Sequence, residues 1–263
     1  MNRLLCAVAL WFVAASAVAQ VVPDAPPVNA EAYVLMDAQT GQILAKRNAD
    51  ERRDPASITK VMTSYVAFDE IAKGHARMED EVLISEAAWR QGIDSTQSRM
   101  FIEVGRRVSL EDLLRGIIVQ SGNDASVAIA EHLAGSKAGF AGLMNAEAQR
   151  LGMRNSNFLN ASGMPEEGHY SSARDIAIMV QALVRDFPEK YAMYAEKEFT
   201  YNNIRQFNRN RLLWRDSTVD GVKTGHTRAA GYCLAASAER DGRRLISVIL
   251  GAPSENQRTQ DSM

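Results

Sequence analysis

The stretch Asp54-Pro55-Ala56-Ser57-Ile58-Thr59-Lys60 places a serine and a lysine three positions apart at a predicted helix start. Pro55 suits the first turn of a helix, and apolar residues recur at helical spacing over residues 61–66. Ser57 and Lys60 are therefore expected on one face near the helix N-terminus. Unpaired backbone amides and the positive end of the helix dipole would stabilise an oxyanion there. The stretch predicts a site for a nucleophilic serine.

A Ser-x-x-Lys pair is by itself a common coincidence. In a chain of 263 residues this spacing is expected about once by chance. A serine near the helix N-cap and a solvated lysine would explain the pair without any chemistry. The functional interpretation therefore depends on motifs further along the chain.

Composition and charge restrict the class of protein. The chain is 46% hydrophobic and 24% charged, which is typical of a globular protein with one large domain or two small ones. Its net charge is -2, so no basic excess exists to neutralise phosphates, and no nucleic-acid partner is expected. Small-molecule partners are favoured.

The first 19 residues have the pattern of a secretory signal peptide. Arg3 precedes an apolar run over residues 4–13, and Ala17-Val18-Ala19 is a small-residue cleavage signature. The run is short for a membrane span, and an N-terminal anchor that stays attached is the alternative. We expect a signal peptide at 1–19, a proline-containing linker at 20–30 and a folded domain from residue 31 onward.

Cleavage of this signal peptide would remove Cys6 and leave Cys233 as the remaining cysteine. Export therefore cannot be accompanied by an internal disulfide, and stability must come from the core. Cys233 lies between Tyr232 and Leu234 in an apolar run, so we expect a buried small side chain rather than a reactive thiol.

Strand patterns at both ends of the chain enclose a helical middle. Strand-like segments cover residues 33–36, 43–45, 219–223, 231–239 and 244–250. Apolar residues recur at helical spacing over 109–118, 125–133, 140–151 and 172–187. Gly41 and Asp241-Gly242 mark hairpin turns. This order predicts a mixed α/β fold in which an antiparallel sheet built from both chain ends is flanked by helices, with a mostly helical subdomain inserted.

Two short polar motifs fall at the edges of these elements. Ser121-Gly122-Asn123 occupies a tight connection between two helices, which would hold both polar side chains rigidly. Lys223-Thr224-Gly225-His226 lies on a predicted strand, where close approach of a substrate backbone would explain the glycine. A solvated lysine followed by a turn is the simpler alternative for this last motif.

The three motifs, taken in this order, resemble those of the penicillin-recognising serine enzymes. Ser254-Glu255-Asn256 also fits Ser-x-Asn, but it follows the lysine motif and cannot take the middle place. Longer strings narrow the resemblance to low-molecular-weight penicillin-binding proteins, which are serine-type D-alanyl-D-alanine carboxypeptidases. These strings are Asp54-Pro55-Ala56-Ser57, His169-Tyr170-Ser171-Ser172-Ala173-Arg174-Asp175, Asn208-Arg209-Asn210 and Asp220-Gly221-Val222-Lys223-Thr224-Gly225-His226-Thr227. The resemblance implies a β-lactamase/transpeptidase-like catalytic domain over residues 31–263.

The resemblance implies a role for each motif. Ser57 would attack the carbonyl between two D-alanines and form an acyl-enzyme, with Lys60 as base and Ser121 as proton carrier to the leaving amine. Burial and the cation of Lys223 would lower the pKa of Lys60. The substrate-binding residues would be Asn123, Lys223, Thr224, Gly225, His226 and Arg209. Backbone amides of Ser57 and His226 would form the oxyanion hole.

The neighbours Arg209 and Arg211 can be confused in this comparison, because Arg211 stands where the family often has a small residue. The segment between Arg209 and Lys223 is also one residue shorter than the family pattern, which leaves the geometry of this loop open. No cofactor or metal is expected, since His75, His132 and His169 lack metal-ligand spacing.

Partners and surroundings also follow from the resemblance. The substrates would be peptidoglycan stem peptides ending in D-Ala-D-Ala, β-lactam antibiotics would acylate the serine, and the location would be the periplasm. Family members continue with a long helix, a β-rich domain and an amphipathic helix that binds the inner membrane. We therefore expect the sequence to stop at Met263 within the last helix of its catalytic domain, and a longer parent to reach the inner-membrane surface.

Three alternatives stay open at this point. A β-lactamase shares the motifs, but commonly has an aspartate in place of Gly122 and a Glu-x-x-Leu-Asn string that this sequence lacks before its last strands. A receptor that binds penicillin or peptidoglycan without turnover is compatible with all three motifs. A D,D-endopeptidase acting on cross-links is the third, because the sequence does not settle bond preference.

Overall fold

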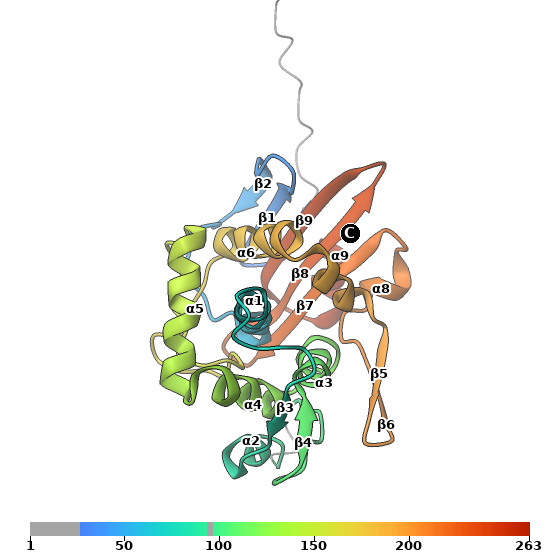
Figure 1. Cartoon of the computed structure of the whole chain (residues 1–263). Coiled ribbons are helices and arrows are strands. Elements are labelled where there is room, and N and C mark those ends of the chain that lie inside the picture. The colour runs from blue at the N-terminus through green and yellow to red at the C-terminus, as the bar shows by residue number, and fades with distance from the viewer. Residues whose placement is uncertain (1–26, 94–96) are drawn as a thin grey trace, which may run out of the picture.

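The structure is a computed structural model and describes residues 27–93 and 97–263 (Figure 1). The predicted signal peptide at 1–19 and most of the predicted linker at 20–30 lie outside the described residues. Within the described ranges, no helix is both long enough and apolar enough to cross a membrane.

A five-stranded antiparallel sheet joins the two ends of the described chain, in the order β2-β1-β9-β8-β7 (Figure 1). β1 pairs with β9 along its whole length, so that Val34 lies opposite Val248. The strands are β1 (Ala32–Asp37), β2 (Ile43–Arg47), β7 (Val219–Thr227), β8 (Gly231–Arg240) and β9 (Arg243–Ala252). The predicted sheet built from both chain ends is confirmed.

Residues with positive φ lie in the hairpin turns of this sheet. Gly41, at φ 72°, follows β1. Asp241 and Gly242, between β8 and β9, have φ values of 51° and 74°, as a two-residue type I′ turn requires. Such turns match the twist of the strands, so they fix which residues of β8 and β9 lie opposite each other.

The helix α1 (Thr59–Ala72) lies at the centre of the molecule (Figure 1). Every residue from Thr59 to Phe68 is buried, because α1 contacts the sheet through β7 and three other helices. Those helices are α4 (Asn123–Ala134), α5 (Lys137–Leu151) and α6 (Ala173–Asp186), of which α6 also packs on β1 and β9. A polar side chain on α1 is thus held in a water-poor interior.

Serine caps and terminal glycines set the helix boundaries close to the predicted ones. Ser109 accepts a hydrogen bond from Asp112 N at the start of α3 (Leu110–Arg115). Ser172 caps α6 in the same way. Gly152 ends α5 in the left-handed conformation.

The sequence pattern does not indicate two short two-stranded sheets that the structure contains. They are β3 (Glu81–Leu83) with β4 (Arg107–Ser109), and β5 (Glu198–Tyr201) with β6 (Ile204–Phe207). Strands of three or four residues are too short for alternation to stand out. Short helical segments also escape the pattern: α2 (Glu86–Gln91), α7 (Pro188–Tyr191) and α8 (Leu212–Arg215). A further helix, α9 (Glu255–Asp261), lies where the family resemblance implies one.

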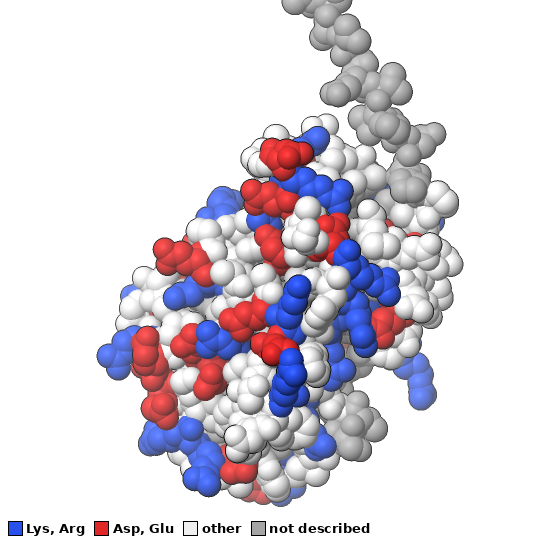
Figure 2. Space-filling model, turned by 90° about the vertical axis from the view of Figure 1, so that its right-hand side faces the viewer, with Lys and Arg blue, Asp and Glu red and all other residues white. Residues whose placement is uncertain are grey.

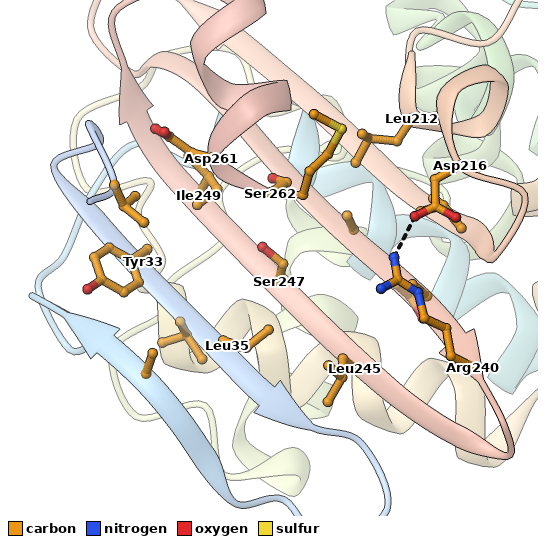
Figure 3. A pocket seen from close by; sticks show the side chains of 18 of the residues that line it. Tyr33, Leu35, Leu212, Asp216, Arg240, Leu245, Ser247, Ile249, Asp261 and Ser262 are labelled. Carbon is orange, nitrogen blue, oxygen red and sulfur yellow. Dashed lines mark hydrogen bonds and ion pairs between the residues drawn. The ribbon is translucent and has the colours of Figure 1, made fainter. Parts of the chain in front are cut away.

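The two faces of the sheet have different surroundings. Val34 and Met36 of β1 are buried in the main core, whereas Tyr33 and Leu35 point to the opposite face. That opposite face carries an apolar groove with a volume of about 380 Å³. Arg240 and Asp216 form an ion pair of 2.6 Å at its border (Figure 3). The polar motifs do not line this groove.

Candidate active site

Ser57 lies in a short 3-10 turn directly before α1. This turn, η1 (Ala56–Ile58), follows Pro55, and Ala56 has a positive φ of 47°. The sequence predicts Ser57 within the first α-helical turn, so the structure differs by placing it just ahead of the α-helix. The structure does bring the first motif together, because Lys60 Nζ lies 3.0 Å from Ser57 Oγ.

Lys60 is almost completely buried, with 1% of its surface exposed. Its Nζ lies 3.0 Å from Ser57 Oγ, 2.8 Å from Asn123 Oδ1 and 2.6 Å from the carbonyl oxygen of Ser162. Burial lowers the pKa of Lys60 to about 7, although the nearby Asp124 opposes this shift. Near neutral pH the amine and the ammonium form therefore coexist.

The three partners of Lys60 Nζ orient its lone pair. Asn123 Oδ1 and the Ser162 carbonyl are acceptors, so each takes an N–H from the amine. A neutral amine has two N–H bonds and one lone pair, so these two contacts leave the lone pair directed at Ser57. The Ser57 hydroxyl can then donate to Lys60, which is the geometry of a nucleophile beside its base.

Ser121 and Asn123 lie in the connection that the sequence predicts between two helices. A π-helical turn, η2 (Gly116–Gln120), ends at Ser121, which adopts the left-handed conformation at φ 67°. Asn123 begins α4, and its Nδ2 donates to Gln97 Oε1 at 2.8 Å. Both residues are about 4% exposed and line the same cavity as Ser57.

Asp124, which the sequence analysis does not single out, holds this connection in place. Its carboxylate accepts hydrogen bonds from the backbone N–H groups of Met100, Phe101 and Ala125 at 2.9–3.0 Å. It is 1% exposed. An acidic residue directly after the Ser-Gly-Asn motif is the available sequence signal, but its partners Met100 and Phe101 are 24 and 23 residues away and cannot be identified from sequence.

The loop over residues 160–165 contributes a backbone group that the sequence analysis also misses. Its Ser162 carbonyl accepts the hydrogen bond from Lys60. Gly163 follows at φ 78°, and a Cβ there would overlap the carbonyl oxygen of Ala56. A glycine is therefore required for this loop to approach the Ser57 turn.

The third motif lies on β7, opposite the Ser57 turn. Lys223 is 2% exposed, and its pKa lies well below the usual value because of burial and the cations Lys60, Arg209 and Arg258. Thr224 lines the cavity beside it. The imidazole of His226 is exposed and stacks on Tyr232 with ring centres 4.1 Å apart.

Gly225 has a different structural reason from the one that the sequence suggests. A Cβ on Gly225 would lie 2.9 Å from the carbonyl oxygen of Pro55 and 3.2 Å from Ser57 N. The close approach that needs a glycine is therefore made by the chain's own Ser57 turn. Gly225 still lines the cavity, so it also remains next to any substrate.

Two arginines lie at one end of this cavity. Arg209 is exposed, and its Nε donates to Gln120 Oε1 at 3.2 Å. Arg258 of α9 is 6% exposed and donates through Nη1 to the carbonyl oxygen of Gly225 at 3.1 Å. The sequence analysis misses Arg258, because nothing in its surroundings marks a site. Arg211 does not line this cavity, so the structure distinguishes it from Arg209.

The cavity has a volume of about 670 Å³ and brings the predicted residues of all three motifs around one space. Its lining includes Ser57, Ser121, Asn123, Thr224, Gly225, His226 and Arg209. Lys60 and Lys223 are buried beside it. This size suits a ligand of a few residues.

His169 and Cys233 are both buried. Leu159 N donates to His169 Nδ1, so the neutral ring carries its proton on Nε2 and donates to Thr59 Oγ1 at 2.9 Å. Burial lowers the pKa of His169 to about 4, which keeps the ring neutral. Cys233 is fully buried, and burial raises the pKa of its thiol to about 11.

Residues 19–254 match the sequence family described as D-alanyl-D-alanine carboxypeptidase, known as the peptidase S11 family. The chain belongs to this family. The D-alanyl-D-alanine carboxypeptidase DacA of Escherichia coli is 48% identical over 244 residues, which cover 92% of this chain and 60% of the relative. The D-alanyl-D-alanine carboxypeptidase DacF of Bacillus subtilis is 41% identical over 234 residues. The matched region covers 88% of this chain and 59% of DacF. The chain thus spans about 60% of these curated relatives.

Solved structures of penicillin binding proteins have the same fold. Penicillin binding protein 5 from Haemophilus influenzae superposes with a TM-score of 0.87 at 47% identity, over 90% of this chain and 69% of that one. Penicillin binding protein 6B from Escherichia coli gives a TM-score of 0.88 at 43% identity, over 92% and 77% of the two chains. The predicted β-lactamase/transpeptidase-like fold is confirmed.

The acidic residues of this peptidase S11 member are arranged unlike those expected of a β-lactamase. A Cβ on Gly122 would lie 2.7 Å from Asp124 Oδ1, so an aspartate does not fit there. Glu166, in the loop after Ser162, is held by Lys137 at 2.7 Å and does not line the Ser57 cavity. Among the described residues that line this cavity, the sole carboxylate is Glu255, which faces Arg258 at 3.5 Å.

Proposed function

We propose that the chain is an exported serine D,D-carboxypeptidase that removes the terminal D-alanine from peptidoglycan stem peptides. The observation that carries the proposal is the arrangement of Lys60, whose buried Nζ is directed at Ser57 and has a pKa of about 7. The names of the relatives, D-alanyl-D-alanine carboxypeptidases, support this substrate class. β-Lactams would acylate the same serine.

In the acylation step, Ser57 Oγ forms a bond to the carbonyl carbon between the two D-alanines while Lys60 takes its proton. The oxyanion would accept hydrogen bonds from the backbone N–H groups of Ser57 and His226, which the short distance from β7 to the Ser57 turn favours. The tetrahedral intermediate then expels the amine of the last D-alanine. Ser121 would pass a proton to that amine.

Substrate orientation would depend on groups at both ends of the cavity. Asn123 would align the substrate amide near Ser57. Lys223, Thr224 and Arg209 would bind the terminal carboxylate, and Arg258 joins them because of its position in the cavity. A bound carboxylate would raise the lowered pKa of Lys223 and keep that lysine charged. Water then hydrolyses the ester and frees Ser57.

The proposed cellular location of the enzyme is the periplasm. The predicted signal peptide at 1–19 would direct the protein to the periplasm, where peptidoglycan stem peptides occur. The inner-membrane surface would be a further partner.

Intact-mass analysis with penicillin tests the nucleophile. We expect one covalent adduct on the parent protein and none on a Ser57→Ala variant. Release of free D-alanine from a peptide ending in D-Ala-D-Ala tests turnover. No release by a folded, acylated protein would support the receptor alternative, and many turnovers per second on a chromogenic cephalosporin would support the β-lactamase.

A further inference from the structure

A second cavity lies beside the active site, on the side of the molecule that carries α8. It has a volume of about 680 Å³ and is lined by β6, the following segment over 208–211 and α8. We name it the arginine groove, after its side chains Arg205, Arg209, Arg211 and Arg215. Ser57 and the other motif residues do not line this groove. The chemistry proposed for Ser57 therefore leaves the groove without a role.

The arginine groove has an excess of positive charge. Among the described residues, its lining contains four guanidinium groups and one carboxylate, that of Glu255. Arg211 lies 3.6 Å from Glu255, whereas no acidic side chain of the described ranges lies within ion-pair distance of Arg209 or Arg215. Figure 2 shows Lys and Arg side chains gathered near the middle of the face that carries β5, β6 and α8 in Figure 1. Such a groove attracts a partner that carries carboxylates or other anions.

Exposed aromatic side chains border these arginines. Phe207 and Trp214 line the groove and are 52% and 47% exposed. The guanidinium of Arg205 lies 5.0 Å from the centre of the Phe207 ring and pairs with Glu198 on β5. Exposed aromatic residues beside arginines are typical of surfaces that bind a partner chain.

One edge of β6 has no neighbouring strand in the part of the chain that the structure describes. β5 and β6 form a two-stranded sheet, and Asn208 N continues its ladder by donating to the carbonyl oxygen of Lys197 at 2.8 Å. Hydrogen-bonded pairs alternate along an antiparallel ladder, so the backbone groups of Arg205 and Phe207 point away from β5. An extended chain can add to such an edge through backbone hydrogen bonds.

Gln206 contributes a buried hydrogen-bond acceptor to the lining of the groove. It is 3% exposed, and its Nε2 donates to the carbonyl oxygen of Met100 at 3.1 Å. Its Oε1 has no hydrogen-bond partner among the described residues. A buried acceptor without a partner costs free energy, so it favours a ligand that brings a donor. A peptide brings N–H donors, whereas a phosphodiester group brings none.

We propose that the arginine groove is a docking surface for an extended acidic segment of a partner protein. The segment adds as a strand to the free edge of β6 and brings an N–H donor to Gln206. Its carboxylates pair with the arginines, and its apolar side chains cover Phe207 and Trp214. An anionic membrane would fit the charge and the aromatic side chains, but it has no strand to pair with β6.

A synthetic probe tests this docking surface on the full chain. The probe is a capped, fluorescent peptide of about eight residues in which glutamate alternates with valine. One matched peptide has glutamine in place of glutamate, and another has N-methyl groups on alternate backbone nitrogens. Fluorescence anisotropy compares the parent with Arg211→Ala/Arg215→Ala. The control is Arg77→Ala/Arg106→Ala, which removes the same charge from exposed arginines that pair with Asp80 and Glu103 elsewhere.

We expect the acidic probe to bind the parent with a Kd of about 100 µM or tighter. The groove variant should bind about fivefold more weakly, because it loses exposed charge pairs. The control variant should match the parent, and thermal unfolding should show that both variants fold. The glutamine and N-methylated peptides should each bind the parent about fivefold more weakly than the acidic probe. Added salt should weaken binding of the acidic probe.

Different outcomes overturn different parts of the proposal. The docking surface is wrong if the acidic probe does not bind at about 1 mM, or if both double variants weaken it equally. Equal binding of the acidic and N-methylated peptides overturns strand addition to β6. Vesicles of phosphatidylglycerol and phosphatidylethanolamine represent the membrane. Arginine-dependent binding to these vesicles, without binding of the probe, overturns the protein partner.

Discussion

The active-site cavity has different kinds of cation at its two ends. At the lysine end, Lys60 and Lys223 are 1% and 2% exposed, and burial lowers the pKa of both. At the arginine end, Arg209 is exposed to solvent, whereas Arg258 is 6% exposed. Lysine changes its charge when it is desolvated, whereas a guanidinium keeps its charge at any physiological pH. The comparison indicates that one end can transfer protons and the other supplies a fixed charge.

The largest effect is expected when the titratable Lys60 is replaced by arginine, which stays charged. A Lys60→Arg variant keeps a cation beside Ser57 but cannot accept the serine proton. We expect acylation by penicillin to slow about a thousandfold, measured as the rate of adduct formation by mass spectrometry. Thermal unfolding checks that the variant folds. Acylation within tenfold of the parent rate would contradict the role of Lys60 as base.

The next effect concerns the loop that holds Lys60. Gly163→Ala places a Cβ against Ala56 at a φ of 78° and should displace the Ser162 carbonyl. We expect a loss of about 3 kcal/mol in the free energy of unfolding, measured with urea, together with slower acylation. Gly142→Ala is the matched control, because no atom lies within 4 Å of its Cβ position within α5. Equal stability of the two variants would contradict the close approach.

The pH dependence of the acylation rate reports the protonation of Lys60. In the proposed mechanism the neutral amine of Lys60 is the reactive form, and the pKa of Lys60 is about 7. The acylation rate should therefore rise about tenfold per pH unit below that value and level off above it. The sign follows because protonation removes the lone pair. A rate that is constant from about pH 5.5 to 8.5, or that falls, would contradict this assignment.

The smallest effect is expected at the arginine end, because an exposed charge is screened by water. Arg209→Ala should raise KM for a peptide ending in D-Ala-D-Ala about fivefold and leave kcat within about twofold. The same peptide with a C-terminal amide should show no difference between parent and variant. Arg211→Ala serves as the neighbouring control on the linear substrate. An effect on kcat alone would place Arg209 in the chemistry instead.

The sequence is informative where the signal is a side chain or a periodic pattern. The sheet from both chain ends follows from strand patterns and hairpin turns, and Ser57, Lys60 and Asn123 carry recognisable spacing. The structure brings the side chains of Ser57 and Asn123 within hydrogen-bond distance of Lys60 Nζ. Alternation and helical spacing report local burial, so they can be read without knowing the fold.

The rest depends on long-range packing that leaves no local trace. The Ser162 carbonyl is a backbone atom, and any residue could supply it. Arg258 resembles many solvated arginines until α9 is placed beside β8. Gly225 could be noticed, but its neighbour in space, the Ser57 turn, is about 170 residues away and could not be identified.

The pairing of β1 with β9 has a consequence for biogenesis. The strand that carries Val34 finds its partner at Val248, so the sheet cannot close until nearly the whole described chain has been made. Contacts of such high sequence separation form slowly, because a long loop must be ordered first. Synthesis of β9 (Arg243–Ala252) is therefore the step after which the central sheet of this chain can form.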